Sequence, residues 1–466
     1  MPLGPVRSTF GSNAPSLVGP VVDKNHLYAN EIFSTVAENW IQAEFGLKGN
    51  FAMKKMTRLL ALLAVLSLVA AACSSDSDDS APDTTEAPSD TGGDSSGGGT
   101  WDIDAALDAD PDCASPLSGD GLVIGYAADF SDLGGFADAP ASAAAEHFVK
   151  QINCSGGVNG TPVTFEVQDI SGDPEATQRA AQDLIDAGVH GILGPPFPDF
   201  GFPLLQVTGG NVPVIFTGST EPSLADAAAQ SYLVSMDDTL QATAAAEFAL
   251  QQGYETAVTF SAPGPYFGYN PEVFAEVFTA GGGTVISDYI YVPIDDVDFS
   301  TQVNEIANGD APDIVYSAML SFQLTALRSQ MEAAGVEAAY MSTDAFEATG
   351  GYFTEGLEGV FHTTHAFGPD NDRYQKLESS FEAATGAGSE SPTFAALAVD
   401  GIAVIIDAFI RSGSTDPAVI GAAIVDSNNV QGITAELSYN GEANPDKVVF
   451  VHQVVDGAPS LAGTIG

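Results

Sequence analysis

The stretch after Gly119 alternates between two kinds of segment. Short apolar runs rich in valine and isoleucine are followed by turns rich in glycine, proline and aspartate, and then by segments with helical apolar spacing. This alternation is typical of parallel sheets covered by helices. It predicts strands over 122–126, 163–168, 190–193, 214–216, 256–261, 284–291, 314–317 and 340–342. Helices are expected between them, for example over 174–187, 240–252, 271–280 and 322–334.

The alternating pattern divides into two series. Four strand–helix units precede about Met236, and a second series begins at Thr256. A chain of 466 residues is also longer than one hydrophobic core usually fills. The predicted fold class is therefore α/β, with two doubly wound parallel-sheet lobes. A small ligand is expected at the carboxyl ends of the strands, where loops and helix N-termini converge.

Residues 53–73 have a different pattern and read MKKMTRLLALLAVLSLVAAAC. Lys54, Lys55 and Arg58 precede fourteen uncharged residues that end in small side chains. This order is typical of a secretory signal peptide, whereas a transmembrane helix, the alternative, needs about 20 apolar residues. Cys73 follows three alanines and resembles the lipidated cysteine of the bacterial lipobox. We therefore expect a lipoprotein signal peptide over 53–72 and an extracytoplasmic protein, lipid-anchored through Cys73 to the outer face of the cell membrane.

The segments on either side of the signal peptide are expected to lie outside the folded part. Residues 1–52 precede a complete signal, so we interpret them as sequence upstream of a start at Met53 or Met56. A genuine short extension with a helix over 30–45 is the alternative. Residues 74–100 contain little besides serine, aspartate, glycine, threonine and proline, which cannot bury enough surface to fold. Residues 73–118 are therefore expected to form a tether and a segment that leads into the first strand.

The charge balance excludes two classes of partner. The chain has 62 Asp and Glu against 13 Lys and Arg, a formal net charge of −49, and only seven of these bases follow Cys73. Binding to nucleic acids or to anionic lipids needs clustered bases. We therefore expect no nucleic-acid partner, and contact with the membrane only through the lipid anchor.

Two cysteines remain after the expected anchor. In an oxidising compartment, Cys113 and Cys154 are most simply a disulfide pair. Such a bond would stabilise the fold by about 4 kcal/mol in the chain-entropy model. It would fix the segment before the first strand to the domain. Free buried cysteines are the alternative.

Several stretches resemble one protein family and keep its order along the chain. Residues 169–195 read DISGDPEATQRAAQDLIDAGVHGILGP, and the segments INCSGGVNGTPVTF, DFSTQV, DIVYSAM and AAG occur at 152–165, 298–303, 313–319 and 333–335. This set resembles the extracellular solute-binding proteins of the leucine/isoleucine/valine-binding family, which deliver solutes to ABC importers. The resemblance implies a small-molecule solute, an ABC permease and an ATPase as partners. It implies no enzymatic activity and no cofactor.

The same resemblance implies a type I periplasmic binding protein fold. This is a Venus-flytrap of two lobes joined by three crossovers that close over one small molecule. Lobe 1 is expected over 119–238 and 364–430, and lobe 2 over 239–363 and 431–466. A ligand-sensing receptor domain of the same fold, without a role in transport, is the alternative function. An extracytoplasmic enzyme is disfavoured, because no paired acid and base emerge from the sequence.

Three polar residues match the family's contacts to an amino-acid ligand. The resemblance places Asp344, in YMSTDAF, as the partner of the ligand's ammonium group. A carboxylate suits this role because a charge-assisted hydrogen bond contributes about 1.5–3 kcal/mol. A helix cap is the alternative for Asp344. Ser219 and Thr220, in VIFTGSTEPSL, match the carboxylate contacts, with an ordinary hydroxyl turn as the alternative.

One family contact is replaced in this chain. The family has a serine after its Gly-Pro turn, whereas Pro198 or Asp199 stands there. Proline removes a donor, and aspartate repels a carboxylate. This change disfavours a standard amino acid and favours an uncharged or cationic solute, such as an amide, a urea-like or aromatic compound, or a polyamine.

Aromatic residues match the remaining ligand positions of the family. They are expected to sandwich an apolar group or a cation, and burial in the core is the alternative for each. Tyr266 is the strongest of them because PGPYFGYN reads as a loop. The predicted aromatic contacts are Phe136, Phe197, Tyr266, Phe267 and Phe394.

His362 and His365 form an H-x-x-H pair, which is a possible metal site. No acidic or cysteine ligand lies nearby in the sequence, and the segment matches a crossover strand of the family. We therefore expect both histidines to be structural and expect no metal. No phosphate-binding loop or dinucleotide motif is apparent.

Overall fold

The computed structural model of the chain describes residues 101–293, 296–389 and 391–466. The predicted upstream extension, signal peptide, lipidated Cys73 and tether over 74–100 all lie outside these residues. Within them, the chain forms sheets of five and seven strands and a separate two-stranded ribbon. The predicted α/β class with two doubly wound sheets is confirmed.

The first sheet is entirely parallel, in the order β2-β1-β3-β4-β5. Its strands are β1 (Leu122–Ala128), β2 (Val163–Asp169), β3 (Gly191–Gly194), β4 (Val214–Phe216) and β5 (Ser231–Leu233). The strand order reverses between β1 and β3. In a sheet of this kind, the loops after those two strands diverge and leave room for a ligand at their carboxyl ends.

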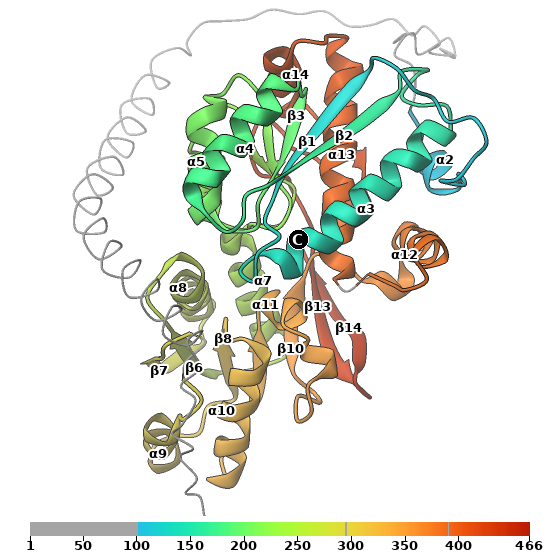
Figure 1. Cartoon of the computed structure of the whole chain (residues 1–466). Helices are drawn as coiled ribbons and strands as arrows, with labels where there is room; N and C mark the ends of the chain where they lie inside the picture. The colour runs from blue at the N-terminus through green and yellow to red at the C-terminus, as the bar shows by residue number, and fades with distance from the viewer. Residues whose placement is uncertain (1–100, 294–295, 390) are drawn as a thin grey trace, which may run out of the picture. The chain divides into compact units, whose positions relative to one another are not determined.

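Helices cover both faces of the first sheet, because successive side chains of a strand point to opposite sides. Ile124 and Tyr126 enter one core cluster, and Ala127 enters the other. Helices α3 (Gly135–Cys154) and α13 (Pro392–Ser412) pack in the first cluster (Figure 1). Helices α4 (Pro174–Asp186) and α5 (Pro198–Thr208) pack in the second. The short α6 (Pro222–Ala225) precedes β5. We call this sheet with its helices lobe 1.

Helix α13 is long and apolar enough to span a membrane, the one such helix in the described part of the chain. Its most apolar window is 78% buried inside the protein, so we assign it as the central core helix of lobe 1. Around it lie α12 (Asp372–Thr385), α14 (Pro417–Ile424), and the ribbon of β11 (Val430–Gln431) and β12 (Glu436–Leu437).

The segment before β1 is held to lobe 1. Helix α2 (Ile103–Leu107) buries apolar side chains in the same core cluster as α3. Cys113 and Cys154 form a disulfide, which joins this segment to the end of α3. Arg373 of α12 adds a paired contact to Asp104, with nitrogen–oxygen distances of 2.8 and 2.9 Å.

The second sheet has the order β14-β13-β10-β9-β8-β6-β7. Five strands are parallel: β6 (Thr256–Ser261), β7 (Thr284–Ile290), β8 (Ile314–Ser317), β9 (Ala339–Ser342) and β10 (Phe361–Thr364). The hairpin of β13 (Val449–Val455) and β14 (Ala458–Ile465) adds antiparallel strands beside β10. We call this sheet with its helices lobe 2.

Helices also cover both faces of the second sheet. One core cluster contains side chains of α7 (Asp238–Gln251) and α8 (Pro265–Ala280). The other contains side chains of α9 (Ser300–Asn308), α10 (Ser321–Ala333) and α11 (Ala345–Ala348). The 3₁₀ turn η1 (Gly351–Phe353) follows α11.

The chain passes between the two sheets three times. It leaves lobe 1 at 234–237, returns at 365–371 through the 3₁₀ turn η2 (Gly368–Asp370), and enters lobe 2 again at 438–448. The expected three crossovers are therefore present.

The predicted strands agree with the observed ones to within two residues at each end. One prediction is wrong: the segment with Tyr266 and Phe267 is not a loop but the first part of α8. A proline inside this helix, Pro271, suggested a start there. Pro271 has no N–H to donate back to the Phe267 carbonyl, and this carbonyl instead accepts a hydrogen bond of 3.1 Å from the Ala262 N–H. The helix therefore continues through the proline.

Candidate functional site

Asp344 follows β9 and immediately precedes the short helix α11. Its side chain makes no capping hydrogen bond to that helix. One carboxylate oxygen instead accepts a hydrogen bond of 2.5 Å from the Tyr266 hydroxyl, at the start of α8. The Thr343 hydroxyl lies 2.7 Å from the same Tyr266 oxygen. The contacts of Asp344 thus do not support the helix-cap alternative.

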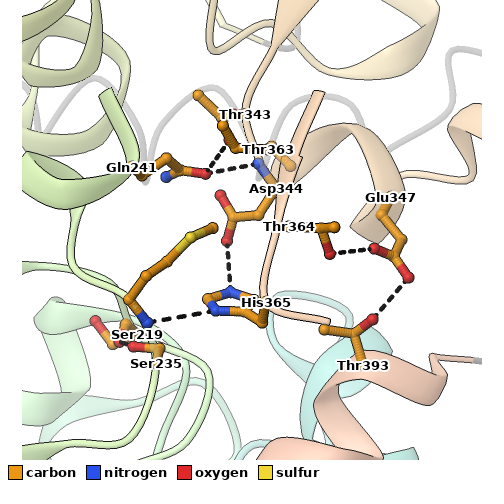
Figure 2. Close-up of polar contacts among 12 residues, drawn as sticks. Ser219, Ser235, Gln241, Thr343, Asp344, Glu347, Thr363, Thr364, His365 and Thr393 are labelled. Carbon is orange, nitrogen blue, oxygen red and sulfur yellow. Dashed lines mark hydrogen bonds and ion pairs between the residues drawn. The ribbon is translucent and has the colours of Figure 1, made fainter. Parts of the chain in front are cut away.

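His365 contacts the other oxygen of Asp344. Its Nε2 lies 3.4 Å from Asp344 Oδ2, and its Nδ1 accepts a hydrogen bond of 3.4 Å from the Met236 N–H (Figure 2). Burial lowers the pKa of His365, so the imidazole is neutral near pH 7 and its single N–H points at the carboxylate.

The carboxyl group of Asp344 is nevertheless ionised. Burial opposes its ionisation, but the hydrogen bond and the charge of His365, which is protonated in acid, outweigh the burial and lower the pKa of Asp344. Near pH 7 the pair is therefore a carboxylate beside a neutral imidazole, and it carries one negative charge.

Gln241 of α7 fixes the backbone at Asp344. Its side-chain oxygen accepts hydrogen bonds of 2.9 Å from the Asp344 N–H and 2.8 Å from the Thr363 hydroxyl (Figure 2). Its amide nitrogen donates at 3.3 Å to Asp238, which also accepts a bond of 3.1 Å from Asn270. Burial, together with the charge of Asp344, raises the pKa of Asp238 well above its usual value. The position of Asp344 therefore depends on α7, α8, β9 and β10 together.

A second carboxylate, Glu347, lies on α11 close to Asp344. Its oxygens accept hydrogen bonds of 2.6 Å from Thr393, at the start of α13, and 2.8 Å from Thr364, at the end of β10 (Figure 2). Burial raises the pKa of Glu347. Because α13 belongs to lobe 1 and α11 to lobe 2, the bond to Thr393 links the two lobes.

Both carboxylates line a cavity of about 440 Å³, a volume within the range of about 300–1,000 Å³ found for small-molecule sites. Its walls come from α11, η1, the crossover after β10, α12, the start of α13 and the β13–β14 hairpin. No lysine or arginine is among the described residues that line it. Polar and aromatic side chains in its wall include Asp344, Glu347, Tyr352, Glu378, Phe394 and His452.

The predicted ligand residues and this cavity overlap in part. Asp344 and Phe394 line the cavity. Tyr266 acts on it through its hydrogen bond to Asp344. Phe267 packs instead against the core of lobe 2, in agreement with the alternative of burial in the core.

Phe136 lies beside Phe394, and Phe197 lies beside Phe136, but neither Phe136 nor Phe197 is in the cavity wall. The Phe136 ring centroid is 6.0 Å from that of Phe394 and 6.3 Å from that of Phe197. Phe136 is 43% exposed. The two residues follow β1 and β3, so this aromatic cluster stands where the strand order of lobe 1 reverses.

Ser219 and Thr220 are buried in the turn after β4, and neither lines the cavity. The Ser219 carbonyl accepts a hydrogen bond of 2.7 Å from the Ser235 hydroxyl, and the Thr220 carbonyl accepts one of 2.8 Å from the Asp238 N–H. These contacts brace the crossover into α7. Pro198 and Asp199, at the substituted family position, form the first turn of α5.

Sequence reasoning missed several residues of the cavity wall. Glu347 stands three residues after Asp344, but no local pattern distinguishes it from an ordinary surface acid. His452 and Tyr352 reach the cavity only because β13 pairs with β10 and η1 follows α11. The valine-rich run 449–455, interrupted by a histidine, is the one signal that would have marked His452.

The H-x-x-H histidines contact protein groups. His365 pairs with Asp344, and His362 contacts Tyr352 and the Thr363 carbonyl. Among the residues that the structure describes, no group of three or more His, Cys, Asp or Glu side chains is arranged to hold a metal.

Comparison with known proteins gives a consistent result. The family model described as "Periplasmic binding protein" matches residues 121–458. A Leu/Ile/Val-binding protein homolog from Brucella melitensis is 23% identical over 300 residues, which is 64% of this chain and 81% of that protein. The Leu/Ile/Val-binding protein BraC3 from Rhizobium johnstonii is 22% identical, over 63% of this chain and 81% of that protein.

Solved structures share the fold. A leucine-binding protein from Thermotoga maritima superposes with a TM-score of 0.62 at 21% identity, over 74% of this chain and 99% of that one. A solute-binding protein of an ABC transporter from R. palustris, solved with benzoate, has a TM-score of 0.61 at 18% identity, over 74% and 96% of the two chains.

Proposed function

Because the chain belongs to the periplasmic binding protein family, we propose that it is the solute-binding protein of an ABC importer. It captures a small amino-acid-like, amide or amine solute between its two lobes. The observation that carries this proposal is the cavity of about 440 Å³, whose wall combines α11 and β13 of lobe 2 with α12 and α13 of lobe 1. The printed names of the relatives, which are Leu/Ile/Val-binding proteins, support the same role.

The mechanism is binding followed by closure of the lobes, without catalysis. A solute that contacts Asp344 on lobe 2 and Phe394 on lobe 1 favours the state in which both contacts exist, by its differential affinity for that state. The three crossovers act as the hinge. A micromolar affinity needs only about 8 kcal/mol, which one charged pair and the burial of an apolar group can supply.

The setting follows from the same proposal. The protein works outside the cytoplasm, lipid-anchored through Cys73, and passes its solute to a permease and an ATPase. Its lobes meet at the crossovers 234–237, 365–371 and 438–448, near the boundaries expected from the sequence, which are 119–238 with 364–430 and 239–363 with 431–466. The ribbon of β11 and β12 packs in the core of lobe 1. The disulfide between Cys113 and Cys154 supports an oxidising compartment.

A thermal-shift screen of the purified chain tests the proposal, with amino acids, amides, urea and polyamines as the library. We expect one solute class to raise the melting temperature, with no product formed on long incubation. Asp344→Asn should weaken the shift of any amine. Asp288→Asn is the matched control. Asp288 lies on β7, accepts hydrogen bonds from two hydroxyls of β6, and does not line the cavity. Turnover of a solute, or no shift from any compound, would overturn the proposal.

A further inference from the structure

One residue that lines the cavity has a buried imidazole nitrogen without a partner among the described residues. His452 lies on β13, is 3% exposed and lines the cavity. Its Nδ1 lies 2.8 Å from the Tyr352 hydroxyl oxygen. Its Nε2 has no hydrogen-bond partner among the described residues. A buried polar atom without a partner is rare, because its desolvation is not compensated.

The hydrogen bonds around Tyr352 determine whether this nitrogen donates or accepts. His362 Nδ1 lies 3.0 Å from the Thr363 carbonyl oxygen, which can only accept, so Nδ1 carries the proton. Burial lowers the pKa of His362 to about 4, so its imidazole is neutral and its Nε2 is an acceptor. That Nε2 lies 2.5 Å from the Tyr352 oxygen. Tyr352 must therefore donate its single proton to His362.

The same reasoning then fixes His452. Since Tyr352 has already donated its proton, its oxygen accepts at the second contact, and His452 Nδ1 carries a proton. Burial lowers the pKa of His452 to about 3, so this imidazole is also neutral. A neutral imidazole has one N–H. His452 Nε2 is therefore a lone-pair acceptor, and what it lacks is a donor.

The carboxyl groups of Asp344, Glu347 and Glu378 also line the cavity. Asp344 is ionised beside neutral His365, and Glu347 receives hydrogen bonds from two hydroxyls. One buried oxygen of Glu378 has no partner among the described residues. The ionised carboxylate of Asp344 would repel a guest carboxylate and attract a guest cation.

Aromatic rings complete the wall. Tyr352, Tyr374 and Phe394 all line the cavity, and such rings favour a cation over their faces. The lone-pair acceptor, the negative charge and the aromatic faces of the wall therefore all favour a cation that carries N–H donors.

We propose that the solute is an organic cation with several N–H donors and no carboxylate, and that His452 Nε2 accepts one of these N–H groups. This inference rests on the proposed function and specifies its substrate class. It also assigns His452 as a ligand-binding residue. His452 lies on β13, toward the end of the lobe 2 sheet that is opposite β6 and β7.

Titration calorimetry on the purified chain tests the class with matched probes. We use butylguanidinium, butylammonium and agmatine against butyrate, 4-aminobutyrate and leucine. The cations should bind, and the compounds with a carboxylate should bind at least tenfold more weakly. Tetramethylammonium, a cation without any N–H, should also bind at least tenfold more weakly than butylammonium. This last comparison uses only the wild-type chain.

Substitution of His452 tests the residue. In His452→Asn, the side-chain amide can still donate to Tyr352 but places no atom at Nε2. We expect binding of the best cation to weaken about tenfold to a hundredfold, the loss of one charge-assisted hydrogen bond. His452→Gln places an amide oxygen near Nε2 and should restore part of the affinity. His190→Asn is the control, since His190 bonds to the Val123 N–H and does not line the cavity.

The outcomes separate this inference from the proposed function. If a carboxylate or a neutral solute binds better than every cation, the inference is wrong and the proposed function stands. The assignment of His452 Nε2 as an acceptor is overturned if wild type and His452→Asn bind the best cation equally well. It is also overturned if the wild-type chain binds tetramethylammonium as tightly as butylammonium. If no solute binds in any assay, the proposed function itself fails.

Discussion

Tyr352 offers a direct test of the hydrogen-bonded chain behind the cavity. In Tyr352→Phe, the ring and its contact with Phe346, at a centroid distance of 5.8 Å, remain. The hydroxyl that joins His362 and His452 is lost. Both imidazoles are nearly fully buried, with 0% and 3% exposure, so water cannot easily replace it.

The expected loss of stability follows from the two groups left unpaired. Each buried group that loses its partner costs about 1–3 kcal/mol. We therefore expect Tyr352→Phe to lower the free energy of unfolding by about 2–6 kcal/mol, as measured by urea denaturation at pH 7 with linear extrapolation.

The chain contains a matched control for this substitution. Tyr340 is 5% exposed, and its hydroxyl has no hydrogen-bond partner among the described residues. Tyr340→Phe removes the same atom without breaking a hydrogen bond, so it should leave stability unchanged or raise it slightly. If Tyr352→Phe costs no more than Tyr340→Phe, the assigned donors and acceptors around Tyr352 are wrong.

Three further predictions concern stability. Replacing Cys113 and Cys154 by serine opens a loop of sequence separation 41 and should lower the free energy of unfolding by about 4 kcal/mol. If a reductant lowers the stability of wild type and of the double variant by the same amount, this prediction is wrong. Burial lowers the pKa of Lys447 to about 8, so the unfolded chain binds more protons than the folded one between this pH and about 10.4. The stability of wild type relative to Lys447→Met should therefore rise by about 3 kcal/mol over that range, and a flat difference in urea denaturation would refute the assignment. Burial raises the pKa of Asp138 well above its usual value, so its protonated form stabilises the fold in acid and this contribution is lost as pH rises through the folded pKa. Wild type should lose stability relative to Asp138→Asn as pH rises from 4 to 7. If wild type instead gains stability relative to the variant over this range, the raised pKa of Asp138 is wrong.

The fold was largely predictable because its central strands are buried on both faces. The run 214–216, for example, is apolar throughout, and Pro213 and Gly218 mark its ends, so local sequence alone identifies it. The start of α8 was not predictable in this way. It depends on the Ala262 N–H, which satisfies the Phe267 carbonyl that Pro271 leaves without a donor.

The site was predictable only in part. The resemblance to the binding-protein family placed Asp344 and Phe394 at ligand positions, and both line the cavity. His452 stands more than one hundred residues later in the sequence and reaches the same cavity because β13 pairs with β10. Phe267 illustrates the converse, since sequence alone cannot decide which side of a helix faces a ligand and which faces the core of lobe 2.

Small-angle X-ray scattering tests the central claim most directly, namely that one solute is held between two lobes that close on it. The measurement compares the purified chain alone and saturated with the tightest solute found by calorimetry. We predict that the radius of gyration and the maximum dimension both decrease on saturation, and that Asp344→Asn abolishes the decrease at the same solute concentration. Stoichiometric binding of a solute with an unchanged scattering profile would contradict the account.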